Sequence, residues 1–177
     1  MLPQKLLETV AKPRYIYRIF VNLLTLTNNK SITMTSVNPY LIFNGDCAAA
    51  FELYKSVFGG EYPYIGKFSD MPPADGQTLD PEDADKIMHV SLPIGGETIL
   101  MGSDTTKGQG GMKVGDNVSI SINTDSRAEA DRLFNGLSAE GEVKMPMEKT
   151  FWGAYFGMFV DKFGINWMVN FDESPQK

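Results

Sequence analysis

Residues 38–46 read NPYLIFNGD, and residues 117–125 read NVSISINTD. Each stretch is a short run rich in β-branched or aromatic residues, followed by an Asn, one residue and an Asp. Such runs favour strands. The second stretch begins 79 positions after the first (38 to 117). Self-similarity at a fixed offset is typical of internal duplication, so we predict two copies of one module.

A helix is expected directly after each of these strands. We expect Asp46 to cap the first helix, and Ser126 with Glu129 has the spacing of a capping box for the second. Apolar residues then recur at helical spacing in both copies. They are Ala50, Leu53, Tyr54, Val57 and Phe58 in the first copy and Ala130, Leu133, Phe134 and Leu137 in the second.

Three further strands are predicted in each copy from β-prone runs bounded by turn residues. They are 61–68, 86–93 and 97–102, then 142–148, 154–161 and 165–171. Each module is therefore β-α-β-β-β, within an α+β fold class. We place the modules at about 37–104 and 117–172, joined by the glycine-rich linker 103–116, within a single domain 34–177.

Residues 1–33 differ from the rest in charge, with five basic residues and one acid. The apolar stretch 15–26 is too short to span a bilayer and is interrupted by Arg18 and Asn22. We interpret 1–33 as a leader or upstream extension outside the fold. The alternative is an amphipathic segment that lies on a surface.

Composition excludes several classes of function. The chain carries 16 basic and 22 acidic residues, a net charge of −6, and an acidic surface repels phosphate backbones, so we expect no nucleic-acid partner. The single cysteine, Cys47, and the single histidine, His89, exclude a disulfide framework, a Cys-rich zinc site and a two-His metal pair within the chain. With no membrane-spanning stretch elsewhere, we expect no membrane partner and a cytoplasmic location.

Several motifs together resemble the vicinal oxygen chelate superfamily, the glyoxalase and bleomycin-resistance fold, and within it the PhnB-like group. They are residues 38–46, 51–60 (FELYKSVFGG), 86–89 (KIMH), 151–153 (FWG) and 161–170 (DKFGINWMVN). The resemblance implies two βαβββ modules that form a curled, partly open mixed sheet around a cavity. It also implies a homodimer.

The resemblance further implies a metal site, with ligands on the first and last strand of each module. The matching positions, within one residue, are Asn38, Leu100, Asn117 and Met168. Asparagine is a poor ligand for a transition metal, leucine is none, and a thioether favours copper(I). We therefore expect no metal and no cofactor, with a divalent metal at an atypical site as the alternative.

His89 is the side chain best suited to proton transfer near neutral pH. Alternation along the strand predicts that Met88, Val90 and Leu92 pack on a helix while Ile87, His89 and Ser91 face the cavity. We take His89 as the candidate catalytic residue. The alternative is a hydrogen-bonded histidine in a polar wall, without chemistry.

The same alternation selects the ligand-binding candidates, a set of amides, hydroxyls and large side chains suited to a small polar ligand. They are Asn38, Tyr40, Asn117, Ser119, Asn166 and Met168, with Trp152 from the aromatic run 151–157.

The function favoured by these observations is metal-independent binding of a small polar molecule in the cavity between the modules. The alternative is an enzyme of lyase, isomerase or dioxygenase type that uses His89 as acid or base, or an atypical metal site. Whether the chain is an enzyme stays open. A methyltransferase reading finds no support, because no glycine-rich loop follows a strand in a parallel α/β pattern.

Overall fold

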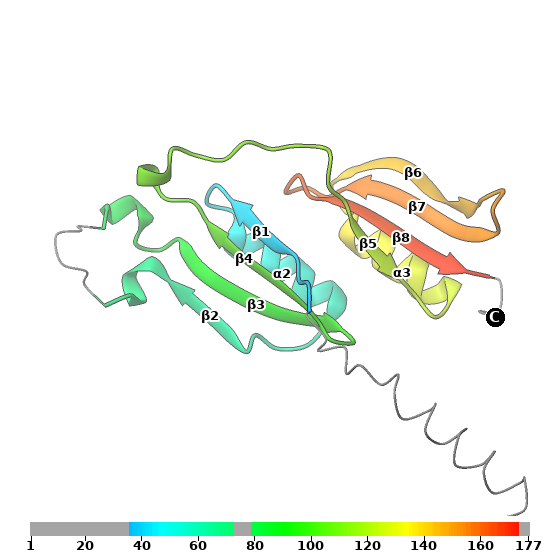
Figure 1. Ribbon diagram of the computed structural model, residues 1–177, viewed down its shortest axis with the longest axis horizontal. Helices are drawn as coiled ribbons and strands as arrows, with labels where there is room; N and C mark the ends of the chain where they lie inside the picture. The colour runs from blue at the N-terminus through cyan, green and yellow to red at the C-terminus, as the bar shows by residue number, and fades with distance from the viewer. Residues whose placement is uncertain (1–35, 73–78, 174–177) are drawn as a thin grey trace, which may run out of the picture. The chain divides into compact units, whose positions relative to one another are not determined.

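The computed structural model describes residues 36–72 and 79–173, which fall within one compact unit, Ser36–Lys177. In these ranges the chain forms two four-stranded mixed sheets, each with one α-helix (Figure 1). The α+β class and the two βαβββ modules are thereby confirmed. The predicted leader 1–33 lies outside the described residues and stays a prediction.

The first sheet has the strand order β1-β4-β3-β2. Its elements are β1 (Tyr40–Phe43), α2 (Cys47–Phe58), β2 (Tyr64–Lys67), β3 (Ile87–Gly95) and β4 (Thr98–Asp104). Strand β1 pairs in parallel with β4, and the other pairs are antiparallel. Gly95 and Gly96 form the turn between β3 and β4, and both residues have positive φ, which glycine adopts without steric cost.

The second sheet repeats this arrangement in the order β5-β8-β7-β6. Its elements are β5 (Ile120–Asn123), α3 (Arg127–Leu137), β6 (Glu142–Lys149), β7 (Ala154–Val160) and β8 (Asn166–Asp172). Strand β5 pairs in parallel with β8, as β1 does with β4. Both first strands are shorter than predicted, because Asn38 and Asn117 precede the paired residues. The duplication in the sequence is therefore a duplication of topology.

The two helices begin in different ways. The Ser126 side chain accepts a hydrogen bond from the Glu129 amide, as the capping-box spacing predicts. Asp46 occupies the corresponding position before α2, but its side chain makes no capping bond. Instead Oδ1 of Asp104, at the end of β4, accepts from the amides of Gly45 and Cys47 at 2.8 and 3.0 Å. Asp46 is therefore the N-cap residue, as predicted, but its side chain does not cap the helix, because a carboxylate distant in sequence accepts from amides at the helix N-terminus.

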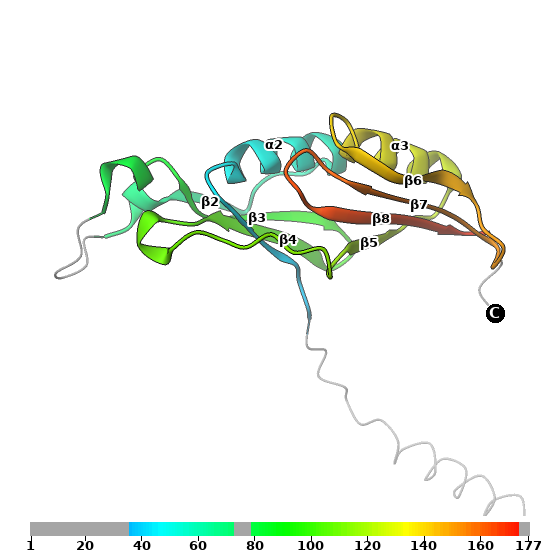
Figure 2. The ribbon, with the colours of Figure 1, turned by 90° about the horizontal axis from the view of Figure 1, so that it is seen from above.

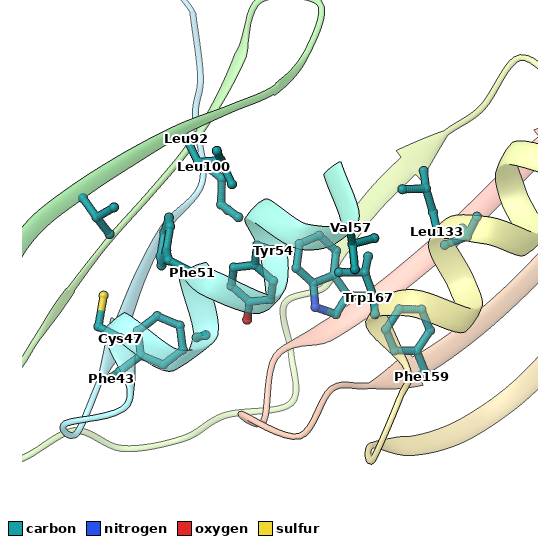
Figure 3. Packing of buried hydrophobic residues seen from close by; sticks show 14 of the residues in the cluster. Phe43, Cys47, Phe51, Tyr54, Val57, Leu92, Leu100, Leu133, Phe159 and Trp167 are labelled. Carbon is teal, nitrogen blue, oxygen red and sulfur yellow. The ribbon is translucent and has the colours of Figure 1, made fainter. Parts of the chain in front are cut away.

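Helices α2 and α3 pack against each other on the same side of the two sheets (Figure 2). Their apolar stripes and the facing sheet residues form one core that continues from module to module (Figure 3). Tyr54 and Phe58 of α2 contact the Trp167 ring of β8, with centroids 5.6 and 6.0 Å apart. A Cβ at Gly136 would lie 2.9 Å from Val57, so the close approach of the helices requires glycine there.

The opposite faces of the sheets are less covered, and on the first sheet this face carries Tyr40 and His89, which alternation assigned to the cavity. Tyr40 and Ile42 are 46% and 49% exposed while Phe43 is buried. On β3, Val90 and Leu92 are buried as predicted, but Ile87 is buried too. An irregularity in the β2–β3 pairing places Ile87 opposite Lys67 and breaks the alternation at this end of the strand. Within the described part of the chain, no helix combines the length and apolar character needed to cross a bilayer.

Candidate functional site

A cavity of about 690 Å³ lies where the two modules and their linker meet. The first module contributes residues from β1 and the end of β4, and the second contributes β5 and the β7–β8 turn. The lining residues of greatest chemical interest are Tyr40, Ser103, Gln109, Lys113, Phe163 and Asn166. Much of the remaining wall is aliphatic, so the cavity is more apolar than the sequence predicted.

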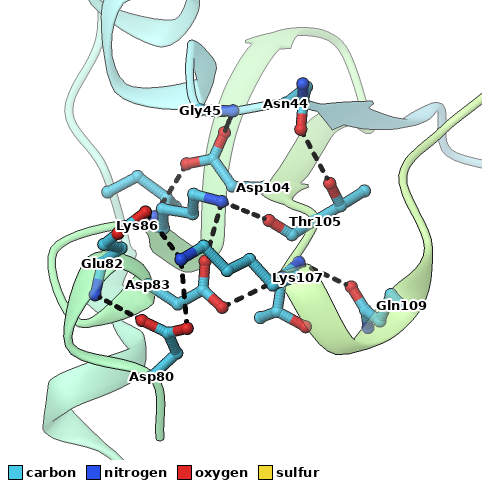
Figure 4. A network of polar contacts seen from close by, with 12 residues as sticks. Asn44, Gly45, Asp80, Glu82, Asp83, Lys86, Asp104, Thr105, Lys107 and Gln109 are labelled. Atoms are coloured by element: carbon cyan, nitrogen blue, oxygen red, sulfur yellow. Dashed lines mark hydrogen bonds and ion pairs between the residues drawn. The ribbon is translucent and has the colours of Figure 1, made fainter.

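Ion pairs and hydrogen bonds attach the first residues of the linker to residues 80–86 (Figure 4). Buried Asp83 pairs with Nζ of Lys86 at 2.8 Å and accepts from the Lys107 amide at 3.0 Å. Lys86 also donates to the Thr105 carbonyl at 3.1 Å. Nζ of Lys107 lies 2.7 Å from Glu82. The Lys86 hydrogen bond and the Lys107 amide lower the pKa of the Asp83 carboxyl. The first residues of the linker are thus fixed although the sequence reads as a flexible connector.

Asp104 forms the junction between this wall and the first module. Its Oδ2 accepts from the Ile87 amide at 2.9 Å, in addition to the two amides that Oδ1 receives at the start of α2. The residue is 2% exposed. Three main-chain donors therefore compensate a carboxylate that would otherwise be costly to bury.

The opposite wall is the turn between β7 and β8, organised by Asp161. Its Oδ1 accepts from the amides of Phe163 and Ile165 at 2.9 and 3.0 Å. Its Oδ2 accepts from Tyr54 and Trp167 at 2.7 and 2.9 Å. Since Tyr54 belongs to α2, one buried carboxylate fixes both the shape of the turn and its position against the first module.

His89 lies on the exposed face of the first sheet between two tyrosines. Its Nδ1 is 3.2 Å from the Tyr40 hydroxyl, and its ring centroid is 5.7 Å from that of Tyr40 and 5.8 Å from that of Tyr64. The imidazole is partly exposed. A histidine that contacts one hydroxyl and stays open to solvent has the geometry needed to exchange a proton with a ligand. His89 does not line the 690 Å³ cavity, but Tyr40, which contacts His89, does.

The structure brings together only some of the predicted ligand-binding residues. Tyr40 and Asn166 line the cavity described above. Asn38 and Ser119 line a second cavity of about 780 Å³, between the β3–β4 hairpin and the start of α3. Asn117, Met168 and Trp152 line neither. Trp152 is 57% exposed in the β6–β7 turn, where its ring contacts Phe151 and Phe156.

The positions that match the metal ligands of the superfamily do not form a ligand set. Leu100 is completely buried on the helix side of its sheet. The side chain of Asn38 accepts a 2.8 Å hydrogen bond from the Ile99 amide. No group of three His, Cys, Asp or Glu side chains in residues 36–72 and 79–173 is placed to hold a metal ion. The residues present therefore do not fit the metal that the fold family implies.

Cys47, just inside the N-terminus of α2, has no access to a ligand. It is fully buried, and burial followed by the nearby Asp104 charge raises the pKa of its thiol. The helix N-terminus, which would lower this pKa, is already occupied by the Asp104 carboxylate. Cys47 is a core residue.

Sequence reasoning missed the linker residues of the cavity, Gln109 and Lys113 among them. A glycine-rich segment between two modules has the composition of a solvent-exposed connector. Only the tertiary structure shows that residues 109 and 111–115 line the cavity, and that the Lys107 amide donates to Asp83.

Comparison with known proteins finds one matching family model and several related bacterial proteins. The family model described as 3-demethylubiquinone-9 3-methyltransferase matches residues 35–170. Protein YjdN of Escherichia coli is 30% identical over 142 residues, which is 76% of this chain and 93% of YjdN. Protein PA1353 from Pseudomonas aeruginosa has a crystal structure and is 44% identical, with a TM-score of 0.66 over 78% of this chain and 98% of that one.

More distant solved structures share the fold. A putative 3-demethylubiquinone-9 3-methyltransferase, the PhnB protein from Bacillus cereus, is 20% identical, with a TM-score of 0.60 over 77% of this chain and 99% of the other. The fosfomycin resistance protein FosX from Listeria monocytogenes, crystallised with Mn(II) and sulfate, is 14% identical, with a TM-score of 0.52 over 78% and 92% of the two chains. These two likenesses concern the fold alone.

Proposed function

We propose a function for this chain from the premise that it belongs to the 3-demethylubiquinone-9 3-methyltransferase family, the PhnB-like group of the vicinal oxygen chelate superfamily. The proposed function is to bind a small organic molecule in the cavity between its two modules, without a divalent metal. The cavity itself carries the proposal. Its volume of about 690 Å³ lies within the roughly 300–1,000 Å³ typical of small-molecule sites.

The composition of the wall supports a ligand with an apolar body and a few polar groups. Leu41, Ile42, Ile120 and Ile165 supply apolar surface. The polar groups are the Tyr40 and Ser103 hydroxyls and the Gln109 and Asn166 amides. Apolar surface provides most of the affinity of such sites, and a few placed hydrogen-bonding groups fix the orientation.

The experiment is a thermal-shift screen of small organic molecules, with and without EDTA. A bound ligand raises the melting temperature, because ligand at about 100-fold excess over Kd stabilises a fold by about 2.7 kcal/mol. We expect hits that survive EDTA and are lost in Ile42→Trp, which fills this cavity. Ser121→Trp, a matched substitution at an exposed strand position that lines only the second cavity, should keep them.

Metal analysis of the purified protein supplies the contrary outcome. A stoichiometric transition metal, or hits that disappear with EDTA, would show that binding needs a metal.

Methyl transfer, the activity in the family's description, is not what we propose. The loop from β1 to α2, residues 44–46, holds one glycine, whereas a glycine-rich turn cradles nucleotide cofactors in parallel α/β folds.

A second candidate function is an enzyme that uses His89 as acid or base. The 3.2 Å contact between Nδ1 and the Tyr40 hydroxyl favours it, since the hydroxyl can orient the ring. His89→Gln distinguishes the two functions. The substitution should abolish turnover of a substrate if His89 is catalytic, and it should leave ligand affinity largely intact if the chain only binds.

We further propose that two copies pair through the sheet faces opposite the helices. Tyr64, which lies outside both cavities, is 47% exposed there, and large aromatic side chains of this kind are enriched at protein interfaces. Sedimentation equilibrium tests this proposal. A dimer is expected at micromolar concentration, and Tyr64→Lys should weaken it. A monomer of the unmodified chain would contradict the pairing.

A further inference from the structure

Lys113 differs from every other basic side chain in residues 36–72 and 79–173. The other lysines and arginines in these ranges each form an ion pair with an Asp or Glu. Lys113 is exposed and makes no ion pair or side-chain hydrogen bond with a described residue. It lies in the linker and lines the 690 Å³ cavity. In a chain with six more acidic than basic residues, a cation without a carboxylate partner at a cavity wall requires an explanation.

Among the described residues that line the cavity, Lys113 carries the one charge that no partner compensates. The other charged residue of the wall is Asp104. Its carboxylate receives three main-chain hydrogen bonds, from Gly45, Cys47 and Ile87. Lys107, the neighbouring linker cation, is held by Asp80 and Glu82. The cavity therefore combines an apolar wall, neutral hydrogen-bonding groups and one available ammonium group.

The second cavity offers no such group. Its one basic residue, Arg132, donates to both carboxylate oxygens of Glu129 at 2.7–2.8 Å and to the Val57 carbonyl at 2.6 Å. A negatively charged ligand is thus favoured at the first cavity and not at the second.

We propose that the 690 Å³ cavity selects amphipathic organic anions, molecules with one acidic group on an apolar body, and that Lys113 binds the acidic group. This inference rests on the proposed function and names the ligand class of the same site. The aliphatic residues of β1 and β5 contact the body, while the Lys113 ammonium group discriminates against neutral analogues.

A pair of fluorescent probes tests the charge selectivity directly. 8-Anilinonaphthalene-1-sulfonate carries one sulfonate, and N-phenyl-1-naphthylamine has the same ring systems without it. Both gain fluorescence in an apolar site. Lys113→Gln should weaken the affinity for the sulfonate probe by about two- to fivefold, the effect of one partly exposed charge pair. It should leave the affinity for the neutral probe unchanged, and Lys113→Arg should retain the sulfonate affinity.

Two controls assign the effect to this site. Lys144→Gln removes the same charge from an exposed residue that lines neither cavity, so it should not change sulfonate binding. Ile42→Trp should remove binding of both probes, whereas Ser121→Trp should not. Raising the salt concentration should weaken sulfonate binding to the unmodified chain and have little effect on Lys113→Gln.

The outcomes separate this inference from the proposed function. Equal sulfonate affinity in Lys113→Gln and the unmodified chain, with both probes lost in Ile42→Trp, would overturn the anion selectivity and leave the cavity as a binding site. Loss of sulfonate binding in Ser121→Trp instead of Ile42→Trp would place the anion elsewhere and overturn it as well. Probe binding that depends on neither cavity would contradict the proposed function itself.

Discussion

The hydroxyl of Tyr54 donates a 2.7 Å hydrogen bond to Oδ2 of Asp161, a residue 107 positions away in the other module. The same carboxylate binds the Trp167 indole and two main-chain amides of the turn 161–165. Both Tyr54 and Asp161 are buried. This contact joins the helix of the first module to the turn that forms one wall of the candidate cavity.

Tyr54→Phe should therefore destabilise the fold. The substitution removes one of the donors to a buried carboxylate, and hydrogen bonds to charged groups contribute about 1.5–3 kcal/mol. We expect the free energy of unfolding, measured by urea denaturation, to fall by about 2 kcal/mol. Tyr62→Phe is the matched control, because the Tyr62 hydroxyl contacts Glu52 at the surface; a change within about 0.5 kcal/mol is expected there. Equal losses in the two variants would refute the role of the contact.

Asp104→Asn should lower the free energy of unfolding more than Asp46→Asn. Asp104 accepts hydrogen bonds at the start of α2 and at the start of β3, and an amide can supply an acceptor at only one of its two terminal atoms. Losing a helix cap costs about 0.5–2 kcal/mol, and leaving a further buried amide unpaired adds about 1–3 kcal/mol.

Asp46→Asn provides the comparison, since the Asp46 side chain makes no capping bond. Its free energy of unfolding should stay within about 0.5 kcal/mol of the unmodified chain. Circular dichroism during urea denaturation measures both variants. A larger loss at Asp46 than at Asp104 would mean that the cap has been assigned to the wrong carboxylate.

The Asp83 ion pair should contribute a pH-dependent part of the stability. Lys86 lowers the pKa of the Asp83 carboxyl below its ordinary value of 3.8. A carboxyl with a lowered pKa in the folded state stabilises the fold above its unfolded pKa, and this contribution is lost as the pH falls through the folded pKa. The advantage of the unmodified chain over Asp83→Asn should thus be largest at pH 6–7 and shrink below about pH 4.

Urea midpoints measured between pH 7 and pH 3 test this dependence. Asp116→Asn, a substitution in the exposed part of the linker, is the control. Its urea midpoint should differ little from that of the unmodified chain, and the difference should not change with pH. If the difference in urea midpoint between Asp83→Asn and the unmodified chain stays constant down to pH 3, the ion-pair argument is contradicted.

Cys47 should be unreactive in the folded chain. It is fully buried and the pKa of its thiol is raised, so the thiolate, which is the reactive form, is scarce at neutral pH. Ellman's reagent at pH 8 should modify the native protein far more slowly than the same protein in concentrated urea. Since the chain has one cysteine, the signal has a single source. Rapid native modification would show that α2 opens easily at its N-terminus.

The sequence predicted the elements well where a local period carries the information. The helix stripes at 50–58 and 130–137 lie at helical spacing, and their principal residues are buried. The strand candidates all formed, with shifted ends. Strand alternation predicted the wrong face for Ile87. Adjacent residues of β2, Gly66 and Lys67, pair with His89 and Ile87, which are two positions apart on β3, and this irregularity breaks the alternation of faces.

The candidate site was predictable only in part. Tyr40 and Asn166 were selected from strand alternation and do line the cavity between the modules. Met168 and Trp152 lie outside both cavities. Alternation predicts which face of a sheet a residue is on, but it does not predict which other elements that face contacts. Lys113 could not be selected from the sequence, because its lack of a carboxylate partner is visible only once the ion pairs of the other basic residues in 36–72 and 79–173 are known.

The amino-acid sequence by itself determined the duplicated βαβββ module and the apolar faces of its helices, because both depend on residue type and short-range spacing. Only the tertiary structure decided that α2 and α3 pack together, that Asp104 and Asp161 bind amides from distant segments, and that a glycine-rich linker becomes a cavity wall. Contacts such as that between Tyr54 and Asp161 depend on how whole elements pack, and no local pattern specifies that packing.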